Sequence, residues 1–331
     1  MTANPHLRRA FLRHGSAALL ALGCWGALRA QSPSEQLRVL CTGPAGSIPD
    51  IVARRVAEQL AGSYPRGVVV ENRPGAAGQI AVNALKSGPT DGSTVLLAQG
   101  AIATVYPYLY DKLAYDPVLD LQPVSLAAEM TLALAVGPAV PASVGTVREF
   151  IDWIRRNPKL ANIGSPGTGT LPHLLEVMLF REAGVPWQHV TYAGGPPAMV
   201  DLLGGQITAL VLPEGLFRQH RAAGKLRVLA TSGVQRSSYL PDVPSFAEQG
   251  MRDLVVREWF AFFMPARVPA ATLEVTSQVL RGAIGRPELA AAFAESGMVP
   301  TSSTPAALAT RIAAEQRYWE PLIRTAGIRV E

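Results

Sequence analysis

Short apolar runs alternate with amphipathic segments in the first third of the chain, and this alternation predicts parallel strands connected by helices. Leu37–Cys41, Gly67–Asn72 and Ser93–Gln99 are rich in β-branched and other apolar residues, which is typical of strands. Between the first two, Ile51–Leu60 places its apolar residues on one helical face. Because parallel neighbours need crossover connections, this segment predicts an α/β domain.

The same alternation returns further along the chain and indicates a second α/β domain. Two apolar runs, Thr131–Val136 and Val255–Met264, lie at the borders of this second series. We interpret the first as a strand that leaves domain 1 and the second as a strand that re-enters it. Two crossing strands form a hinge, which suits a clamshell. We therefore expect residues 31–136 and 256–331 to form domain 1, and residues 137–255 to form domain 2 with a sheet of its own.

Two glycine-rich loops join an apolar strand to a helix, one in each predicted domain. Gly164–His173 precedes the apolar helix pattern of Leu174–Phe180, and Gly43–Asp50 occupies the corresponding place after the first strand. Such a junction exposes unpaired N–H groups at the positive end of a helix dipole, where anions bind. Either loop alone is an ordinary connection. Together they indicate a shared cleft for an anion, with Asp50 as the N-cap of its helix.

The charge distribution excludes an electrostatic case for nucleic-acid binding. The formal net charge of the whole chain is +5. Residues 1–30 contribute Arg8, Arg9, Arg13 and Arg29 and no acidic residue, so the rest of the chain carries a net charge of only +1. A nearly neutral body offers no basic surface to a polyanion.

Residues 1–30 have the pattern of an export signal. Basic residues within Arg8–Arg13 precede an uncharged run, Gly15–Leu28, which is too short to span a bilayer, and Ala30 is a small residue suited to cleavage. The arginine pair resembles a twin-arginine signal, although Leu7 stands where Ser or Thr is usual, and the Sec route stays open. Cys24 raises the alternative of a lipoprotein anchor. We expect a soluble periplasmic protein.

The side chains that carry chemistry do not form a known catalytic or metal motif. After cleavage Cys41 is the one cysteine left, so no intramolecular disulfide is expected. The remaining histidines, His173, His189 and His220, lack metal-ligand spacing, and nucleophile-elbow, Walker and zinc-protease motifs are absent. We expect no metal, no cofactor and no catalysis. A hydrolase that uses Ser165 with His173 remains as a minor alternative.

Several short motifs, in their order and spacing, resemble those of the substrate-binding receptors of tripartite tricarboxylate transport systems, also called Bug-type receptors. The resemblance covers essentially the whole chain after the signal. The segments that carry it are Asp50–Arg54, Val70–Gly78, Asp91–Thr94, Tyr115–Pro117, Gly164–His173, Tyr192–Gly195, Leu202–Gln206 and Leu240–Pro244.

This resemblance implies an α/β, two-domain periplasmic binding protein, type II-like, that closes as a clamshell on a small carboxylate through two hinge strands. It also implies delivery to membrane transporter subunits, and we expect a monomer. A receptor that presents its ligand to a signalling partner would use the same fold. The ligand-binding positions that the resemblance implies are Gly46, Ser47, Asp50, Gln99 and Ala101 in domain 1, and Ser165, Gly167, Thr168, Gly169, Thr170, His173, Tyr192, Ala193 and Gly194 in domain 2.

The chain departs from the family pattern at several of these positions. Ala45-Gly46-Ser47 stands where a Gly-Gly pair is usual, and Thr191 replaces a common proline. Ala193 occupies a position that is often basic, and Leu212-Pro213-Glu214 differs from the usual acidic position. These departures concern the ligand rather than the fold, so the sequence does not identify which carboxylate is bound.

Overall fold

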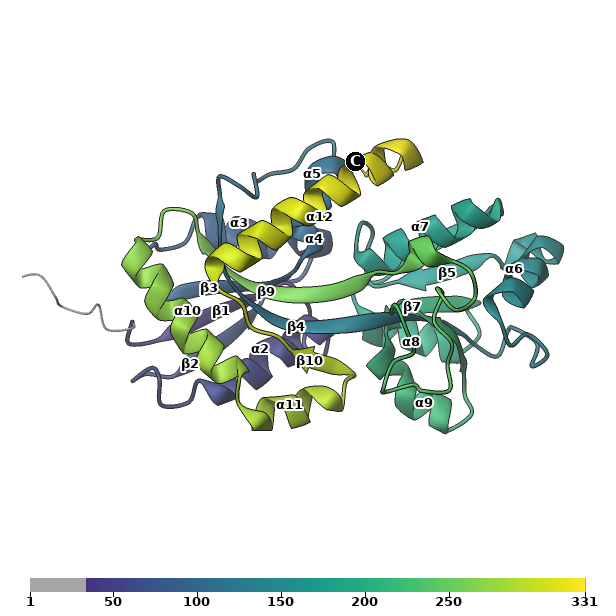
Figure 1. Ribbon diagram of the computed structural model, residues 1–331, viewed down its shortest axis with the longest axis horizontal. Helices are drawn as coiled ribbons and strands as arrows, with labels where there is room; N and C mark the ends of the chain where they lie inside the picture. Colours follow the sequence, from purple (N-terminus) through teal and green to yellow (C-terminus); the bar gives the residue numbers. More distant parts are fainter. Residues whose placement is uncertain (1–33, 331) are drawn as a thin grey trace, which may run out of the picture. The chain divides into compact units, whose positions relative to one another are not determined.

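Strand β4 (Leu121–Val136) joins the two parts of a mixed, ten-stranded sheet in the computed structural model, which describes residues 34–330 (Figure 1). The first part of β4 pairs antiparallel with β9 (Arg257–Pro265). After Thr131 its partners are β7 (Ala209–Pro213) and β8 (Arg227–Thr231). The strands of the second series pair with one another and with the second half of β4, as the sequence predicts. This second sheet is continuous with the first, because β4 is long enough to pair with both series.

The strand order is β2-β1-β3-β9-β4-β7-β5-β6, with β8 and β10 also paired to β4. Strands β1, β2 and β3 are parallel, as are β5, β6 and β7. This confirms the predicted α/β alternation in both parts of the chain. The remaining strands are β1 (Leu37–Cys41), β2 (Val68–Asn72), β3 (Thr94–Gln99), β5 (Asn162–Ser165), β6 (Gln188–Thr191) and β10 (Met298–Pro300).

Helices cover both faces of the sheet (Figure 1). Helices α3, α12, α6 and α7 pack on one face, whereas α2, α10 and α11 cover the other face of the N-terminal part and α8 covers that of the second part. The helices are α2 (Ile48–Gln59), α3 (Gln79–Lys86), α4 (Ala101–Thr104), α5 (Tyr106–Leu109), α6 (Val147–Arg156), α7 (Leu171–Ala183), α8 (Gly195–Leu203), α9 (Arg218–Ala222), α10 (Ala270–Ile284), α11 (Pro287–Ala294) and α12 (Pro305–Ala326).

The side chains of β9 show how the sheet separates two hydrophobic cores. Trp259, Ala261 and Phe263 belong to the core under α3 and α12, whereas Phe260 and Phe262 belong to the core under α2 and α10. This is the two-residue alternation of a strand that is buried on both faces. The aromatic run that the sequence places at the hinge thus anchors β9 to both helical layers.

The predicted export signal, residues 1–30, and the candidate anchor Cys24 lie outside the described residues. Within residues 34–330 no helix is long and apolar enough to cross a membrane.

Candidate functional site

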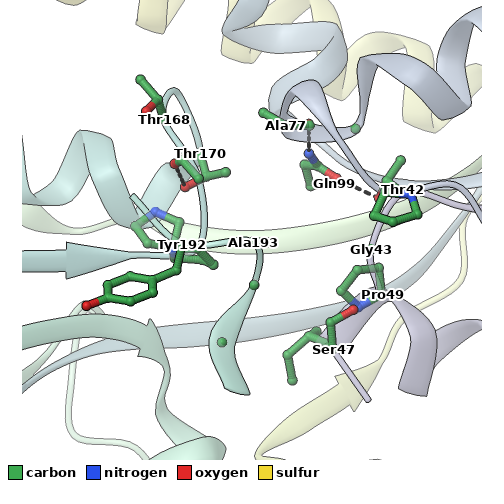
Figure 2. Close-up of a pocket in the computed structure, with 18 of the residues that line it drawn as sticks. Thr42, Gly43, Ser47, Pro49, Ala77, Gln99, Thr168, Thr170, Tyr192 and Ala193 are labelled. Carbon is green, nitrogen blue, oxygen red and sulfur yellow. Dashed lines mark hydrogen bonds between the residues drawn. The ribbon is translucent and has the colours of Figure 1, made fainter. Parts of the chain in front are cut away.

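A cavity of about 720 Å³ lies where strands of both parts of the sheet reach their carboxyl ends (Figure 2). The ends of β1 and β3 contribute to one side, and the loops after β5 and β6 form the other. In Figure 2, Thr168 and Tyr192 face Ser47 and Gln99 across the opening. Ligands of open α/β sheets bind in such crevices outside the carboxyl ends of strands.

The amino ends of four helices face this cavity, and the N-cap residue of each lines it. These residues are Ser47 for α2, Gly78 for α3, Thr170 for α7 and Gly194 for α8. A helix N-terminus carries about half a positive charge and leaves N–H groups without intrahelical partners. The first turns of α3, α7 and α8 contain no acidic residue, whereas that of α2 contains Asp50. Three uncompensated N-termini therefore face the cavity.

Asp50 lies inside the first turn of α2 and is not its N-cap, which corrects the sequence prediction, since Ser47 takes that position. Its Oδ2 accepts the Gly46 N–H at 2.9 Å, and its Oδ1 accepts hydrogen bonds from Arg54 and Asn72. Burial opposes ionisation of the carboxyl group, but these hydrogen bonds, led by that from Arg54, lower its pKa below the ordinary value. Asp50 therefore compensates the α2 N-terminus from within.

The loop before α7 also uses part of its hydrogen-bonding capacity internally. The Gly169 N–H donates to His173 Nδ1 at 3.1 Å, and the Thr170 hydroxyl donates to the Gly167 carbonyl at 2.8 Å. The His173 ring packs against that of His189 with centroids 4.1 Å apart and the ring planes tilted by 31°. Burial lowers the pKa of His173 to about 3, with His189 adding to the effect, and burial lowers that of His189 to about 4. Both rings are thus neutral at neutral pH and act as supports of the loop.

The hydrolase alternative requires Ser165 to pair with His173, but Ser165 pairs with His189 instead. Its Oγ lies 2.8 Å from His189 Nε2, and the residue is completely buried. A nucleophile must reach its substrate, and Ser165 does not line the cavity. The geometry does not favour hydrolysis.

The turn before α3 is strained and lines the cavity, neither of which the sequence reasoning predicted. Ala76 and Ala77 have φ values of +46° and +51°, which non-glycine residues rarely adopt. The Ala77 carbonyl accepts a hydrogen bond from Gln99 Nε2 at 2.6 Å (Figure 2). It also accepts one from the Tyr106 hydroxyl at 2.9 Å. Thr42 in turn donates to Gln99 Oε1 at 2.9 Å. Gln99 therefore holds the turn in place at the cavity edge. Backbone strain of this kind is concentrated at functional sites.

Two contacts connect the opposite sides of the cavity. The Tyr110 hydroxyl donates to the Thr168 carbonyl at 3.2 Å. Gly194 approaches Pro44 so closely that a Cβ at Gly194 would lie 3.3 Å from the proline ring. The loops of the two predicted domains thus approach each other at these two places.

The structure brings together eight of the fourteen sequence-predicted site residues. Ser47 and Gln99 line the cavity from the N-terminal part. From the second part Gly167, Thr168, Thr170, Tyr192, Ala193 and Gly194 line it. The other six, which are Gly46, Asp50, Ala101, Ser165, Gly169 and His173, do not line it. Ala101, Ser165, Asp50 and His173 are buried behind the lining loops.

Glu258 and Phe260 reach the cavity from β9, and sequence reasoning had assigned this stretch to the hinge or the core. Lys112 and Glu258 are the charged residues among those described that line the cavity. Lys112 is exposed, whereas Glu258 is only 4% exposed. Burial, with Glu315 as the second cause, raises the pKa of Glu258 to about 8. The one sequence signal that could have identified Glu258 as a site residue is its charge within an otherwise aromatic and apolar strand.

Comparison with known proteins agrees with this geometry. The sequence profile of the family described as "Tripartite tricarboxylate transporter family receptor" matches residues 52–328. A UPF0065 protein from Bordetella bronchiseptica is 30% identical over 94% of this chain and 91% of its own length. Protein BugT from Bordetella pertussis is 29% identical, over 90% of this chain and 91% of its own length.

Solved structures share the fold. A periplasmic transporter has a TM-score of 0.83 at 28% identity, covering 89% of this chain and 98% of its own. The periplasmic binding protein BugD has a TM-score of 0.82 at 25% identity, covering 89% and 99%. An R. palustris protein solved with adipate has a TM-score of 0.83 at 25% identity, covering 92% and 100%. The fold is therefore the predicted two-domain fold of periplasmic binding proteins, and the chain belongs to the tripartite tricarboxylate transporter receptor family.

Proposed function

We propose that this chain is an exported receptor that captures a small carboxylate in the cavity and delivers it to membrane subunits of a tripartite tricarboxylate transporter, without catalysing a reaction. The observation that carries the proposal is the convergence of the α3, α7 and α8 N-termini on one cavity. The adipate in the similar R. palustris protein supports a carboxylate ligand.

The energetics do not require a buried cation. Micromolar affinity corresponds to about 8 kcal/mol. A hydrogen bond to a charged group is worth roughly 1.5–3 kcal/mol, so four or five of them suffice after the cost of association. Thr168, Ala193 and Gly194 present hydroxyl or backbone donors along the cavity wall. Ser47, by contrast, donates its hydroxyl to the Pro44 carbonyl.

We further propose that residues 31–136 with 256–331 and residues 137–255 move as two domains. The change of partners along β4 supports a division into two domains, but it falls between Thr131 and Leu132, so residues 132–136 pair with the strands of the second domain. A ligand that contacts both sides of the cavity favours the closed arrangement by its differential affinity. The protein would act as a monomer in the periplasm, exported through its first thirty residues.

The experiment that tests the function is calorimetric titration of the purified chain with mono-, di- and tricarboxylates, in parallel with a Gln79→Glu variant. Gln79 is the first residue of α3 and lines the cavity. A carboxylate at this position would compensate the α3 N-terminus and repel an anionic ligand. We expect at least tenfold weaker binding, which corresponds to about 1.4 kcal/mol.

Ile80→Glu is the matched control. Ile80 is the next residue of the same helix, it is 47% exposed, and it does not line the cavity. The added charge stabilises the same helix end but does not face the ligand, so binding should change little. Equal losses in both variants, or no carboxylate binding to the unaltered chain, would contradict the proposal.

A further inference from the structure

Glu258 is a buried acid on the strand that crosses the hinge, and it faces the cavity. It lies on β9 at the position opposite Met130 of β4, on the same face of the strand as Phe260. Both residues line the cavity. In Figure 2 the pale green ribbon of β9 passes behind the labelled side chains. Glu258 therefore lines the cavity from a central strand of the sheet, whereas the loops after β1 and β5 line it from the two sides.

The side chain has an unused hydrogen-bonding atom. Within residues 34–330, Glu258 Oε1 is buried and has no hydrogen-bond partner, and no ion pair involves this carboxyl group. A buried polar atom that is left unpaired costs roughly the desolvation of that atom, so natural proteins rarely keep one without a reason. The unpaired oxygen indicates that a partner arrives from the cavity.

Two other buried acids also hold unpaired carboxylate oxygens, but neither lines the cavity. Glu214 Oε1 accepts a hydrogen bond from the Ser237 hydroxyl at 2.6 Å, and its Oε2 has no partner among the described residues. Glu176 is completely buried in α7 and also lies away from the cavity. Of these three acids, only Glu258 is placed to meet a ligand.

The charged and titratable groups around Glu258 do not supply a counter-charge. Glu315 of α12 and Tyr106 of α5 interact with it, and neither is basic. Arg311 of α12, which lies over the ring of the neighbouring Trp259, is already bound to Glu315 and Glu129. Lys112, the other charged residue that lines the cavity, is exposed and forms no ion pair with Glu258 among the described residues. A cation that neutralises Glu258 would therefore come with the ligand.

We propose that Glu258 determines specificity by accepting a hydrogen bond from an amino group of the bound acid, so that the receptor prefers an amino-substituted carboxylate to a dicarboxylate of the same chain length. This rests on the proposed function, in which the carboxylate of the ligand binds the helix N-termini. Burial keeps Glu258 protonated at neutral pH in the free protein. A ligand ammonium displaces this proton and forms an ion pair that satisfies Oε1. A second carboxylate could only accept a hydrogen bond from the protonated acid, and its own charge would be buried at Glu258 without a partner of opposite sign.

The test is calorimetric titration of the purified chain with three acids of matched length, ε-aminocaproate, adipate and caproate, repeated with δ-aminovalerate, glutarate and valerate. The unaltered chain should bind the amino acid of one set at least tenfold more tightly than its dicarboxylate. Glu258→Gln keeps the shape of the side chain but not its charge. It should weaken binding of the amino acid at least tenfold and leave the affinity for the unsubstituted acid within about twofold of that of the unaltered chain. Glu214→Gln, the same change outside the cavity, should leave the order intact.

Tighter binding of the dicarboxylates by the unaltered chain, or an unchanged order in Glu258→Gln, would overturn the inference while leaving carboxylate capture intact. Failure of every acid to bind, the unsubstituted ones included, would instead overturn the proposed function. Because the order of affinities is measured on the unaltered chain as well, the test does not depend on the folding of a variant.

Discussion

The Asp50 carboxylate accepts the backbone N–H of Gly46 at 2.9 Å and so compensates the N-terminus of α2 from within the protein. Arg54 and Asn72 donate to the other carboxylate oxygen. Of the four helix N-termini at the cavity, that of α2 is the one with an acid in its first turn. The two glycine loops of the sequence are therefore not equivalent as anion sites, although their sequence patterns are similar.

Asp50→Asn should have opposite effects on stability and on binding. Loss of the buried, hydrogen-bonded charge should lower the free energy of unfolding by about 1–3 kcal/mol in urea titrations. The exposed α2 N-terminus should at the same time bind a carboxylate ligand about two- to fivefold more tightly. Asp152→Asn, which removes an exposed ion pair with Arg155, should change both quantities little. Weaker ligand binding by Asp50→Asn would show instead that Asp50 contacts the ligand.

The packed pair of His173 and His189 predicts a loss of stability in acid. The pKa of both rings is lowered by burial, so between pH 6.5 and about 4 the unfolded chain binds protons that the folded chain does not. The free energy of unfolding should therefore fall as the pH is lowered through this range. At pH 5 the loss is about 2 kcal/mol for His173, and it is smaller for the less buried His189, which solvent screens.

Urea titrations at pH 7 and pH 5 test this with two variants. His189→Gln should reduce the difference between the two pH values, because it removes one of the two rings that resist protonation. His220 lies on α9, away from the pair of His173 and His189, so His220→Gln should leave the difference between the two pH values unchanged. An identical pH dependence in all three proteins would contradict the assignment.

Glu176 predicts a pH effect of the opposite sign. Both of its carboxylate oxygens are buried without a hydrogen-bond partner among the described residues, and burial raises its pKa well above the ordinary value. Above pH 4.5 the unfolded chain therefore releases a proton that the folded chain retains, and stability falls as the pH rises. Glu176→Gln should raise the free energy of unfolding at pH 8 and change it little at pH 4.

The control for Glu176 lies on the same helix. Glu182→Gln removes an exposed carboxylate of α7 and should leave stability nearly unchanged at both pH values. If Glu176→Gln does not stabilise the protein at pH 8, a group or water molecule that pairs with this carboxylate must be present.

Local pattern was sufficient for the elements that bring chain segments to the cavity. The glycine loops after β1 and β5 are recognisable because small residues follow an apolar run and precede a helical period, and the cavity lies between them. The two long strands at the domain border are recognisable in the same way. The family resemblance placed these segments in one cleft, and the comparisons confirm the fold.

The features of the site that the sequence did not predict depend on contacts between distant segments of the chain. The left-handed Ala76 and Ala77 cannot be read from their own sequence, because alanine disfavours positive φ, and the turn depends on Gln99, which lies on another strand. Glu258 is buried because β9 passes between helical layers, a fact that a strand pattern does not contain. Which loop amides are already bound, as at Gly46 and Gly169, likewise depends on side chains one helical turn away.

Tyr110 offers a test of how the two sides of the cavity hold together. Its hydroxyl donates to the Thr168 carbonyl, so it links a loop of the N-terminal part to the loop before α7. Tyr110→Phe removes this hydrogen bond, which is worth about 1 kcal/mol, and keeps the ring. If the contact helps to close the cavity over a ligand, dissociation should become roughly fivefold faster, since 1.4 kcal/mol corresponds to a factor of ten. Tyr108→Phe, two residues earlier, should leave dissociation unchanged in the same displacement assay. Equal dissociation rates in Tyr110→Phe and the unaltered chain would mean that the contact does not restrain ligand release.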